Sequence, residues 1–208
     1  MLKIEQIKTG IIEENCYLIY NDKSLLIVDP GAQAQKLLDA ISKINKTPLA
    51  ILLTHTHYDH IGAVEELRKT FDIPVYVSPL EQDWLSNPQM NLSGLARHDD
   101  LPDIVVQPAE YEFEMKDYTI GGMSFTVVPT PGHSIGSVSF IFDDFVVTGD
   151  ALFRGSIGRT DLPTGNQEQL LHSIRTYLFT LPDEFPAYSG HGEATTIGHE
   201  KKTNPFFQ

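Results

Sequence analysis

Four side chains that can bind a metal ion lie within the six residues His55-Thr56-His57-Tyr58-Asp59-His60. An apolar run at 49–54 precedes them and has the length of a buried strand, whereas 61–69 read as a helix. Residues 55 and 57 share one side of an extended segment, and residues 59 and 60 turn away as the helix begins. This spacing favours two adjacent metal ions, each bound by one pair, over the plainer alternative of surface histidines and a helix N-cap at Asp59.

Three further residues of ligand type follow predicted strands and adjoin glycine or proline: His133, Asp150 and His191. Glycine lets the backbone turn sharply, so a side chain at a strand end can point toward a shared site. The sequence therefore predicts one site built from seven ligands. One ion is assigned His55, His57 and His133, the other is assigned Asp59, His60 and His191, and Asp150 bridges them.

Imidazole and carboxylate ligands without thiolate suit Zn²⁺, with Fe or Mn as alternatives. Three protein ligands and a shared carboxylate leave each ion open positions for water, which is typical of a catalytic site. A structural zinc site is the alternative, but it is usually closed by four ligands, mostly cysteine. We therefore predict a cofactor of two divalent metal ions in a catalytic site.

Composition excludes several classes of protein. The net charge is −13 and no Lys/Arg run is longer than a pair, which argues against nucleic-acid binding. Cys16 is the only cysteine, so no internal disulfide forms. No signal-peptide pattern begins the chain, and no apolar run approaches about 18 residues, the length that suggests a membrane span. We expect a cytoplasmic protein without membrane contact, and the oligomeric state stays open.

Apolar periodicity predicts an α/β fold. Along the chain a group of strands is followed by a helix, and this order occurs twice. Two sheets packed face to face with helices outside would bury the apolar faces of these strands and helices. We expect a single domain over 1–208. The expected strands are 2–8, 14–20, 24–28, 49–54, 73–77, 118–120, 125–128, 138–142, 145–148 and 187–189, and the expected helices are 32–45, 61–69, 79–85 and 167–178.

Some residues keep two interpretations. Asp29 ends a strand and is either a fixed site carboxylate or a turn or N-cap residue. Segment 86–108 is either a binding loop or lid, or a surface excursion. His98 lies in that segment and is expected at the surface, and the alternative is that it contacts a substrate. His172 is expected on a solvated helix face.

The complete pattern resembles the metallo-β-lactamase fold superfamily. His-Thr-His-Tyr-Asp-His at 55–60, followed by His133, Asp150 and His191, is similar to that family's HxHxDH signature and its downstream ligands. Asp29-Pro30-Gly31 looks like its early Asp-Pro-Gly turn. The stretch from Gly149 to Asp161, with Asp-Ala-Leu-Phe and Gly-Arg-Thr-Asp, is similar to the glyoxalase II-like branch, in its short hydroxyacylglutathione hydrolase-like form.

This resemblance implies an αββα sandwich of two mixed β-sheets flanked by helices, with a binuclear metal centre. It also implies hydrolysis of thioesters of the S-lactoylglutathione or S-acyl-thiol type by a metal-bridging hydroxide. Asp59 is then a catalytic residue that orients the hydroxide, and Arg159 binds a carboxylate of the thiol carrier. An arginine in that loop can equally brace Asp161.

Two departures bear on the substrate. The helical C-terminal extension of standard glyoxalase II is not seen before Gln208, so coenzyme A or another thiol is as plausible a carrier as glutathione. The alternative functions are a mononuclear-iron persulfide dioxygenase using His55, His133 and Asp150, and a lactone hydrolase on the same centre. The Gly-Arg-Thr-Asp loop argues against a β-lactamase.

Overall fold

The computed structural model describes residues 1–95 and 101–208, so His98 lies outside the described residues. The chain divides into two compact units. Unit 1 comprises 1–113 and 119–123, and unit 2 comprises 114–118 and 124–208. The expectation of one domain over 1–208 stays a prediction.

A mixed sheet forms the centre of unit 1. Among the described residues its strands are ordered β1-β2-β3-β4-β5-β6, antiparallel from β1 to β3 and parallel from β3 to β6. The strands are β1 (Lys3–Thr9), β2 (Glu14–Tyr20), β3 (Ser24–Val28), β4 (Thr47–Leu52), β5 (Val75–Val77) and β6 (Tyr111–Glu112). Because β3 and β4 are parallel, their carboxyl ends meet at one edge, where Asp29 and the segment 53–60 begin.

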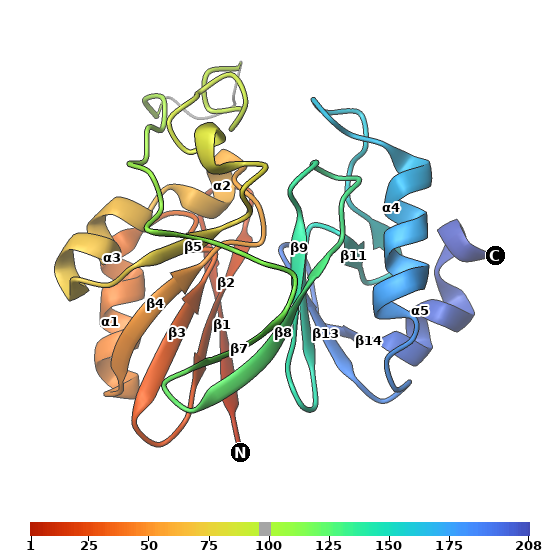
Figure 1. Ribbon diagram of the computed structural model, residues 1–208, viewed down its shortest axis with the longest axis horizontal. Helices are drawn as coiled ribbons and strands as arrows, with labels where there is room; N and C mark the ends of the chain where they lie inside the picture. The colour runs from red at the N-terminus through yellow and green to blue at the C-terminus, as the bar shows by residue number, and fades with distance from the viewer. Residues whose placement is uncertain (96–100) are drawn as a thin grey trace. The chain divides into compact units, whose positions relative to one another are not determined.

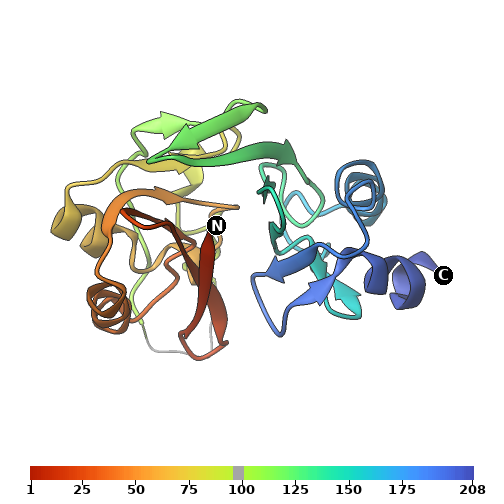
Figure 2. The ribbon, with the colours of Figure 1, turned by 90° about the horizontal axis from the view of Figure 1, so that it is seen from below.

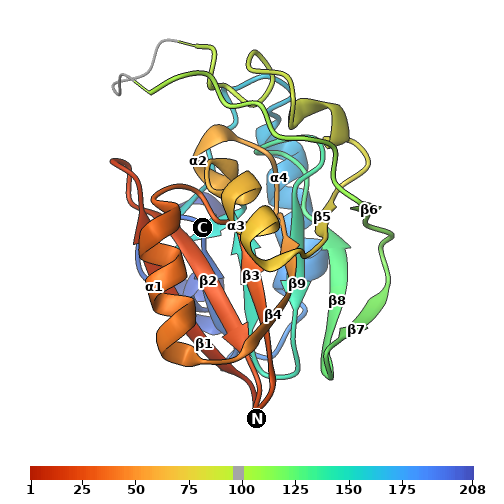
Figure 3. The same cartoon turned by 90° about the vertical axis from the view of Figure 1, so that its left-hand side faces the viewer.

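Helices cover one face of this sheet. The helical elements of unit 1 are α1 (Ala34–Ile44), α2 (Tyr58–Ile61), α3 (Val64–Phe71) and the 3₁₀ helix η1 (Gln82–Trp84). Figure 3 shows α1 and α3 lying across the strands. Their apolar stripes explain this packing, since Leu37, Ile41, Val64 and Leu67 join the core formed with the strands.

A second mixed sheet forms the centre of unit 2, and part of its edge strand β7 is shared with unit 1. In the described chain its order is β14-β13-β10-β9-β8-β7, and only the β10–β13 pairing among those recorded is parallel. The strands are β7 (Asp117–Ile120), β8 (Met123–Pro129), β9 (Val138–Ile141), β10 (Val146–Gly149), β13 (Pro186–Ser189) and β14 (Thr195–Thr196). A separate two-stranded hairpin, β11 (Leu152–Phe153) and β12 (Ser156–Ile157), follows β10.

The helices of unit 2 lie together on one side of its sheet, drawn in blue in Figures 1 and 2. They are α4 (Gln167–Ser173), the π-helical turn η2 (Ile174–Leu178), α5 (Ile197–Thr203) and the 3₁₀ helix η3 (Pro205–Phe207). Leu170, Ile174, Leu178 and Ile197 form a core with the strands. Asn166 and Thr196 cap α4 and α5 by accepting hydrogen bonds from backbone N–H groups.

Two mixed sheets flanked by helices confirm the α/β class, and the strand predictions are largely confirmed. Three predicted helices differ in detail. Residues 61–69 contain the end of α2 and most of α3, residues 79–85 contain only η1, and 167–178 ends in a π turn. Glycine is needed at the end of α2, because a Cβ at Gly62 would lie 2.3 Å from the Gly31 carbonyl oxygen.

Helix α5 and the short strands β6, β11, β12 and β14 were not predicted. Runs of two residues carry no periodic signal, so the sequence could not reveal these strands. Among the described helices, none has both the length and the apolar character needed to cross a bilayer.

Candidate metal centre

The segment after β4 places the imidazole groups of unit 1 close together. His57 is extended and is the N-cap residue of α2, which carries Asp59 and His60. His55, His57 and His60 are buried, and Asp59 is partly buried. The ring centroids of His55 and His57 lie 4.7 Å apart, and those of His55 and His60 lie 4.1 Å apart. The predicted strand, ligand loop and helix start are therefore confirmed as local structure.

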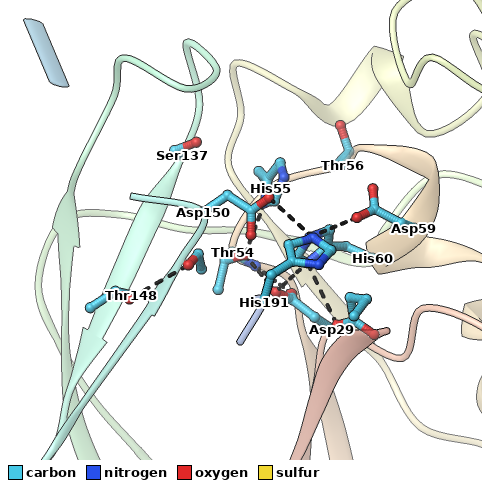
Figure 4. Close-up of polar contacts among 12 residues, drawn as sticks. Asp29, Thr54, His55, Thr56, Asp59, His60, Ser137, Thr148, Asp150 and His191 are labelled. Carbon is cyan, nitrogen blue, oxygen red and sulfur yellow. Dashed lines mark hydrogen bonds and ion pairs between the residues drawn. The ribbon is translucent and has the colours of Figure 1, made fainter. Parts of the chain in front are cut away.

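The Asp29 carboxylate holds this segment through Thr54 and His60, which Figure 4 draws beside it. Its Oδ1 accepts a hydrogen bond from the Thr54 N–H at 2.8 Å, and its Oδ2 accepts from the Thr54 hydroxyl at 2.5 Å. Oδ2 also lies 2.9 Å from His60 Nδ1, so it accepts the proton of that nitrogen. Asp29 is thus a fixed carboxylate at the site and not a helix cap, since the N-cap residue of α1 is Gln33.

Hydrogen bonds at Nδ1 direct Nε2 of these histidines toward a ligand. The Thr54 hydroxyl gives its one proton to Asp29, so at 3.0 Å it accepts from His55 Nδ1. His60 Nδ1 is held by Asp29. Both rings therefore carry their lone pair on Nε2, which is the usual arrangement of a metal-binding histidine and its partner.

Two buried glutamates near this segment were missed by the sequence analysis. Glu81 Oε2 accepts hydrogen bonds from the N–H and the hydroxyl of Thr56, at 2.8 and 2.9 Å. Glu14 Oε1 lies 3.7 Å from His60 Nδ1, and burial raises the pKa of the Glu14 carboxyl well above its usual range. Glu14 follows Glu13 at a strand start and Glu81 precedes a short 3₁₀ helix, so local pattern gives neither residue a role.

Strand direction gathers three predicted ligands in unit 2. Strands β8, β10 and β13 all run the same way, because β9 is antiparallel to both β8 and β10, and β10 is parallel to β13. Their carboxyl ends therefore lie at one edge of the sheet. His133, Asp150 and His191 follow these three strands. His133 Nε2 and His191 Nε2 each lie 3.5 Å from Asp150 Oδ2.

Backbone groups orient the unit 2 ligands. His133 Nδ1 lies 2.7 Å from the Arg159 carbonyl oxygen, which can only accept, so Nδ1 carries the proton and Nε2 the lone pair. The Ser189 hydroxyl donates to the His191 carbonyl at 2.8 Å and fixes the turn after β13. A Cβ at Gly158 would lie 1.8 Å from the Asp150 carbonyl oxygen, so glycine lets the β12 end approach Asp150.

The distances between ligand atoms within each unit suit a shared cation better than direct hydrogen bonds. His60 Nε2 lies 3.4 Å from Asp59 Oδ2, and the two pairs at Asp150 are 3.5 Å apart. Two ligands about 2.0–2.1 Å from one tetrahedral ion are separated by roughly 3.3–3.5 Å, whereas an N–H···O bond measures about 2.9 Å. The His and Asp clusters are therefore suited to binding divalent metal ions.

Arg159 braces Asp161 in the structure. Its Nε and Nη2 atoms donate to the two carboxylate oxygens of Asp161, each at 2.9 Å. These hydrogen bonds lower the pKa of the Asp161 carboxyl. Both side chains are exposed. The alternative that the sequence left open, a brace for Asp161, is thus present, and the contact with a thiol carrier stays a prediction.

The remaining described histidines stand apart from these clusters. His172 is exposed on α4 and contacts Thr176 at 3.4 Å. His199 lies on α5, 3.9 Å from Glu200. The expectation of a solvated helix face for His172 is confirmed.

Comparison with known proteins gives full-length relatives. A probable metallo-hydrolase of Streptococcus pyogenes serotype M6 is 53% identical over 100% of this chain and 91% of its own length. The hydroxyacylglutathione hydrolase GloC of Haemophilus influenzae is 37% identical over 99% of this chain and 98% of its own length. The relatives thus include a protein named as a probable metallo-hydrolase and one named as a hydroxyacylglutathione hydrolase.

Solved structures show the same fold. The crystal structure of BLEG-1 B3 metallo-beta-lactamase matches with a TM-score of 0.94 and 45% identity, covering 99% of this chain and 100% of that one. TTHA1623, solved in a di-iron-bound form, matches with a TM-score of 0.81 and 38% identity, covering 97% and 99%. The metallo-β-lactamase fold implied by the sequence resemblance is therefore confirmed. Residues 10–191 also match the family model itself, and the chain belongs to the metallo-beta-lactamase superfamily.

Proposed function

We propose that this protein is a metal-dependent hydrolase of thioesters of the S-lactoylglutathione or S-acyl-thiol type. The observation that carries the proposal is the arrangement of the ligand histidines in both units. In His55, His60 and His133, Nδ1 faces an acceptor, so the lone pair that a metal ion needs is on Nε2. The likeness to GloC, a hydroxyacylglutathione hydrolase, supports the thioester class.

Seven residues are proposed to hold two divalent ions. His55, His57 and His133 bind one ion, Asp59, His60 and His191 bind the other, and Asp150 bridges both. Bound ions would lower the pKa of water and polarise the substrate carbonyl. Zn²⁺ suits the nitrogen and oxygen donors, and the di-iron form of TTHA1623 makes iron a serious alternative.

Asp59 is proposed as the catalytic residue because one carboxylate can serve two purposes. Its Oδ2 faces His60 Nε2 at 3.4 Å, the spacing of two ligands on one ion. The second oxygen, Oδ1, would then be able to accept a hydrogen bond from the attacking hydroxide and keep it oriented. Asp59 is less buried than His55, His57 and His60 of the same unit, so a small substrate can approach it.

Arg159 is proposed to meet a carboxylate of the thiol carrier. Two of its donors engage Asp161, and the guanidinium is exposed, so further N–H groups face solvent. Asp161 fixes the guanidinium plane, which favours recognition of a second carboxylate. This contact does not distinguish glutathione from other anionic carriers.

Metal analysis of the purified protein combined with a substrate panel tests the proposal. We expect about two metal equivalents and hydrolysis of S-lactoylglutathione or another S-acyl thiol. The variant His57→Ala should lose one ion and at least roughly 100-fold in kcat/KM, because a ligand of the reacting centre is gone. His172→Ala, an exposed histidine on α4, is the matched control and should leave both unchanged. Thioester turnover that survives His57→Ala would refute the mechanism.

β-Lactam hydrolysis is a second candidate, supported by the likeness to BLEG-1 B3 metallo-beta-lactamase. A β-lactam in the same panel separates it from thioester hydrolysis. One bound iron with oxygen uptake on a persulfide substrate would overturn both hydrolase proposals.

We also propose a small-molecule thioester as the partner, no nucleic-acid or membrane partner, and a cytoplasmic location.

A further inference from the structure

A cavity of about 530 Å³ adjoins Asp59 within unit 1. Its walls come from the β1–β2 turn, the segment before α1, helix α2 and residues 101–104. Apolar side chains dominate this lining: Ile11, Ile12, Ala32, Tyr58, Leu101 and Ile104. The volume falls within the range of about 300–1,000 Å³ that small-molecule sites occupy.

Hydrogen bonds hold the wall formed by residues 101–104. The Ile104 N–H donates to Ser93 Oγ at 2.8 Å, and the buried Asn91 side chain donates to the Ile104 carbonyl at 2.9 Å. The Asn91 carbonyl in turn accepts from the Tyr58 N–H at 2.8 Å, beside the ligand Asp59. Residues 101–104 of segment 86–108 therefore form a wall of a cavity and are held in place by hydrogen bonds, which favours the binding-loop interpretation.

The charge of the lining restricts what can enter. The ionisable carboxylates at this cavity are Asp59 and Asp103, and no Lys, Arg or His lines it among the residues that the structure describes. Asp59 is a proposed metal ligand, so a bound ion would offset its charge. An anionic group placed elsewhere in this cavity would meet the carboxylate of Asp103 without a basic side chain to pair with in the described lining. The carboxylates of glutathione, or the phosphates of a nucleotide carrier, are therefore disfavoured in this cavity.

We propose that this cavity is the acyl subsite of the enzyme and takes an uncharged apolar acyl chain, so that longer acyl thioesters are preferred to S-lactoyl or S-acetyl ones. The proposal rests on the proposed thioester hydrolysis, because Asp59 marks the place where the carbonyl reacts. Large apolar side chains at the rim support it, since Ile11, Ile12 and Leu101 are 64%, 45% and 61% exposed. An apolar chain would cover this surface.

A series of acyl thioesters on one carrier tests the preference. The acetyl, butanoyl and hexanoyl thioesters of N-acetylcysteamine differ only in chain length. Each methylene that becomes fully buried raises kcat/KM by up to about fourfold. We expect kcat/KM for the hexanoyl ester to exceed that for the acetyl ester by at least roughly tenfold. Equal values for the three esters would overturn the proposal.

Two matched variants localise the effect. Leu101→Ser removes an exposed apolar side chain from the rim and should reduce the hexanoyl-to-acetyl ratio at least about threefold. Leu80→Ser is the control, because Leu80 is 59% exposed and lies outside the cavity lining. The control should keep the wild-type ratio. A ratio that changes equally in both variants would contradict this location.

Binding of a non-hydrolysable probe separates this proposal from the proposed function. Calorimetry with the intact protein compares the S-hexyl and S-methyl thioethers of N-acetylcysteamine. Tighter binding of the hexyl thioether, weakened by Leu101→Ser and not by Leu80→Ser, supports the cavity even if no thioester is hydrolysed. In that case only the proposed function fails. Thioester hydrolysis without any chain-dependent binding would instead refute the cavity assignment alone.

Discussion

Glu81 and Thr56 are joined by two hydrogen bonds in the interior of unit 1. One carboxylate oxygen, Oε2, accepts from both the N–H and the hydroxyl of Thr56, at 2.8 and 2.9 Å. Thr56 stands between His55 and His57, so this contact fixes the backbone that carries two proposed ligands. Both Glu81 and Thr56 are fully buried. Removing the carboxylate would leave buried donors without this acceptor.

The main expected effect of replacing Glu81 is weaker binding of metal ions. We expect Glu81→Ala to lower metal affinity about 10- to 100-fold, the usual effect of losing a group that orients a ligand. Glu81→Gln keeps one oxygen acceptor, so its metal affinity should lie between those of Glu81→Ala and the wild type. Competition with a chromophoric chelator measures the affinity. Glu66→Gln, an exposed change on α3, is the control, and unchanged affinity in Glu81→Ala would contradict this role.

Asp29 should be needed for the His60 side of the centre. Asp29→Asn keeps the shape but replaces one acceptor oxygen with a donor, which then faces either the Thr54 N–H or the Thr54 hydroxyl and His60 Nδ1. We expect the metal content to fall from about two equivalents toward one, with a loss of about 10- to 100-fold in affinity for the second ion. Asp39→Asn, at an exposed helix position, should behave as wild type. Full metal content in Asp29→Asn would show that His60 keeps its orientation by other means.

Gly158 should tolerate no side chain, in contrast to Gly155 in the same hairpin. A Cβ at Gly158 would lie 1.8 Å from the Asp150 carbonyl oxygen and 3.2 Å from His133 Cβ, so the backbone must move. Overpacking of this kind costs about 1–3 kcal/mol or more. We expect Gly158→Ala to reduce both the free energy of unfolding and the metal content.

Gly155→Ala is the matched control for that change. A Cβ at Gly155 has nothing within 4 Å, and only its positive φ of 70° opposes alanine, at about 1 kcal/mol. Metal content should therefore stay at the wild-type level. Urea unfolding and metal analysis of both variants provide the comparison, and equal losses in the two would argue against a steric cause.

Glu200 should stabilise the C-terminal part of unit 2. Its buried carboxylate accepts hydrogen bonds from the Gly155 N–H at 3.0 Å, the Asn204 amide at 2.8 Å and the Thr195 hydroxyl at 2.5 Å. Glu200→Ala leaves the buried side chains of Thr195 and Asn204 without this acceptor, and we expect a loss of about 2–4 kcal/mol in the free energy of unfolding. Glu200→Gln should lose less. A change below about 0.5 kcal/mol, the range of ordinary surface substitutions, would contradict this contribution.

The sequence by itself determined the ligand types and the local elements that carry them. His55, His57, Asp59 and His60 follow a continuous apolar strand, and their spacing alone indicated a strand end and a helix start. The same signal, a residue of ligand type beside glycine after a strand, predicted His133, Asp150 and His191 as further ligands. Short-range patterns suffice here because strand and helix periodicity is a local property of the chain.

Only the tertiary structure decided which buried groups support those ligands. Asp29 reaches Thr54 and His60, and Glu81 reaches Thr56, across 25 residues or more of sequence. Arg159 contributes its carbonyl oxygen to His133, a contact that no side-chain pattern encodes. Such contacts depend on how parallel strands and loops pack, and packing is set by the whole core. The sequence therefore specifies the chemistry of the ligands, whereas the fold determines their orientation.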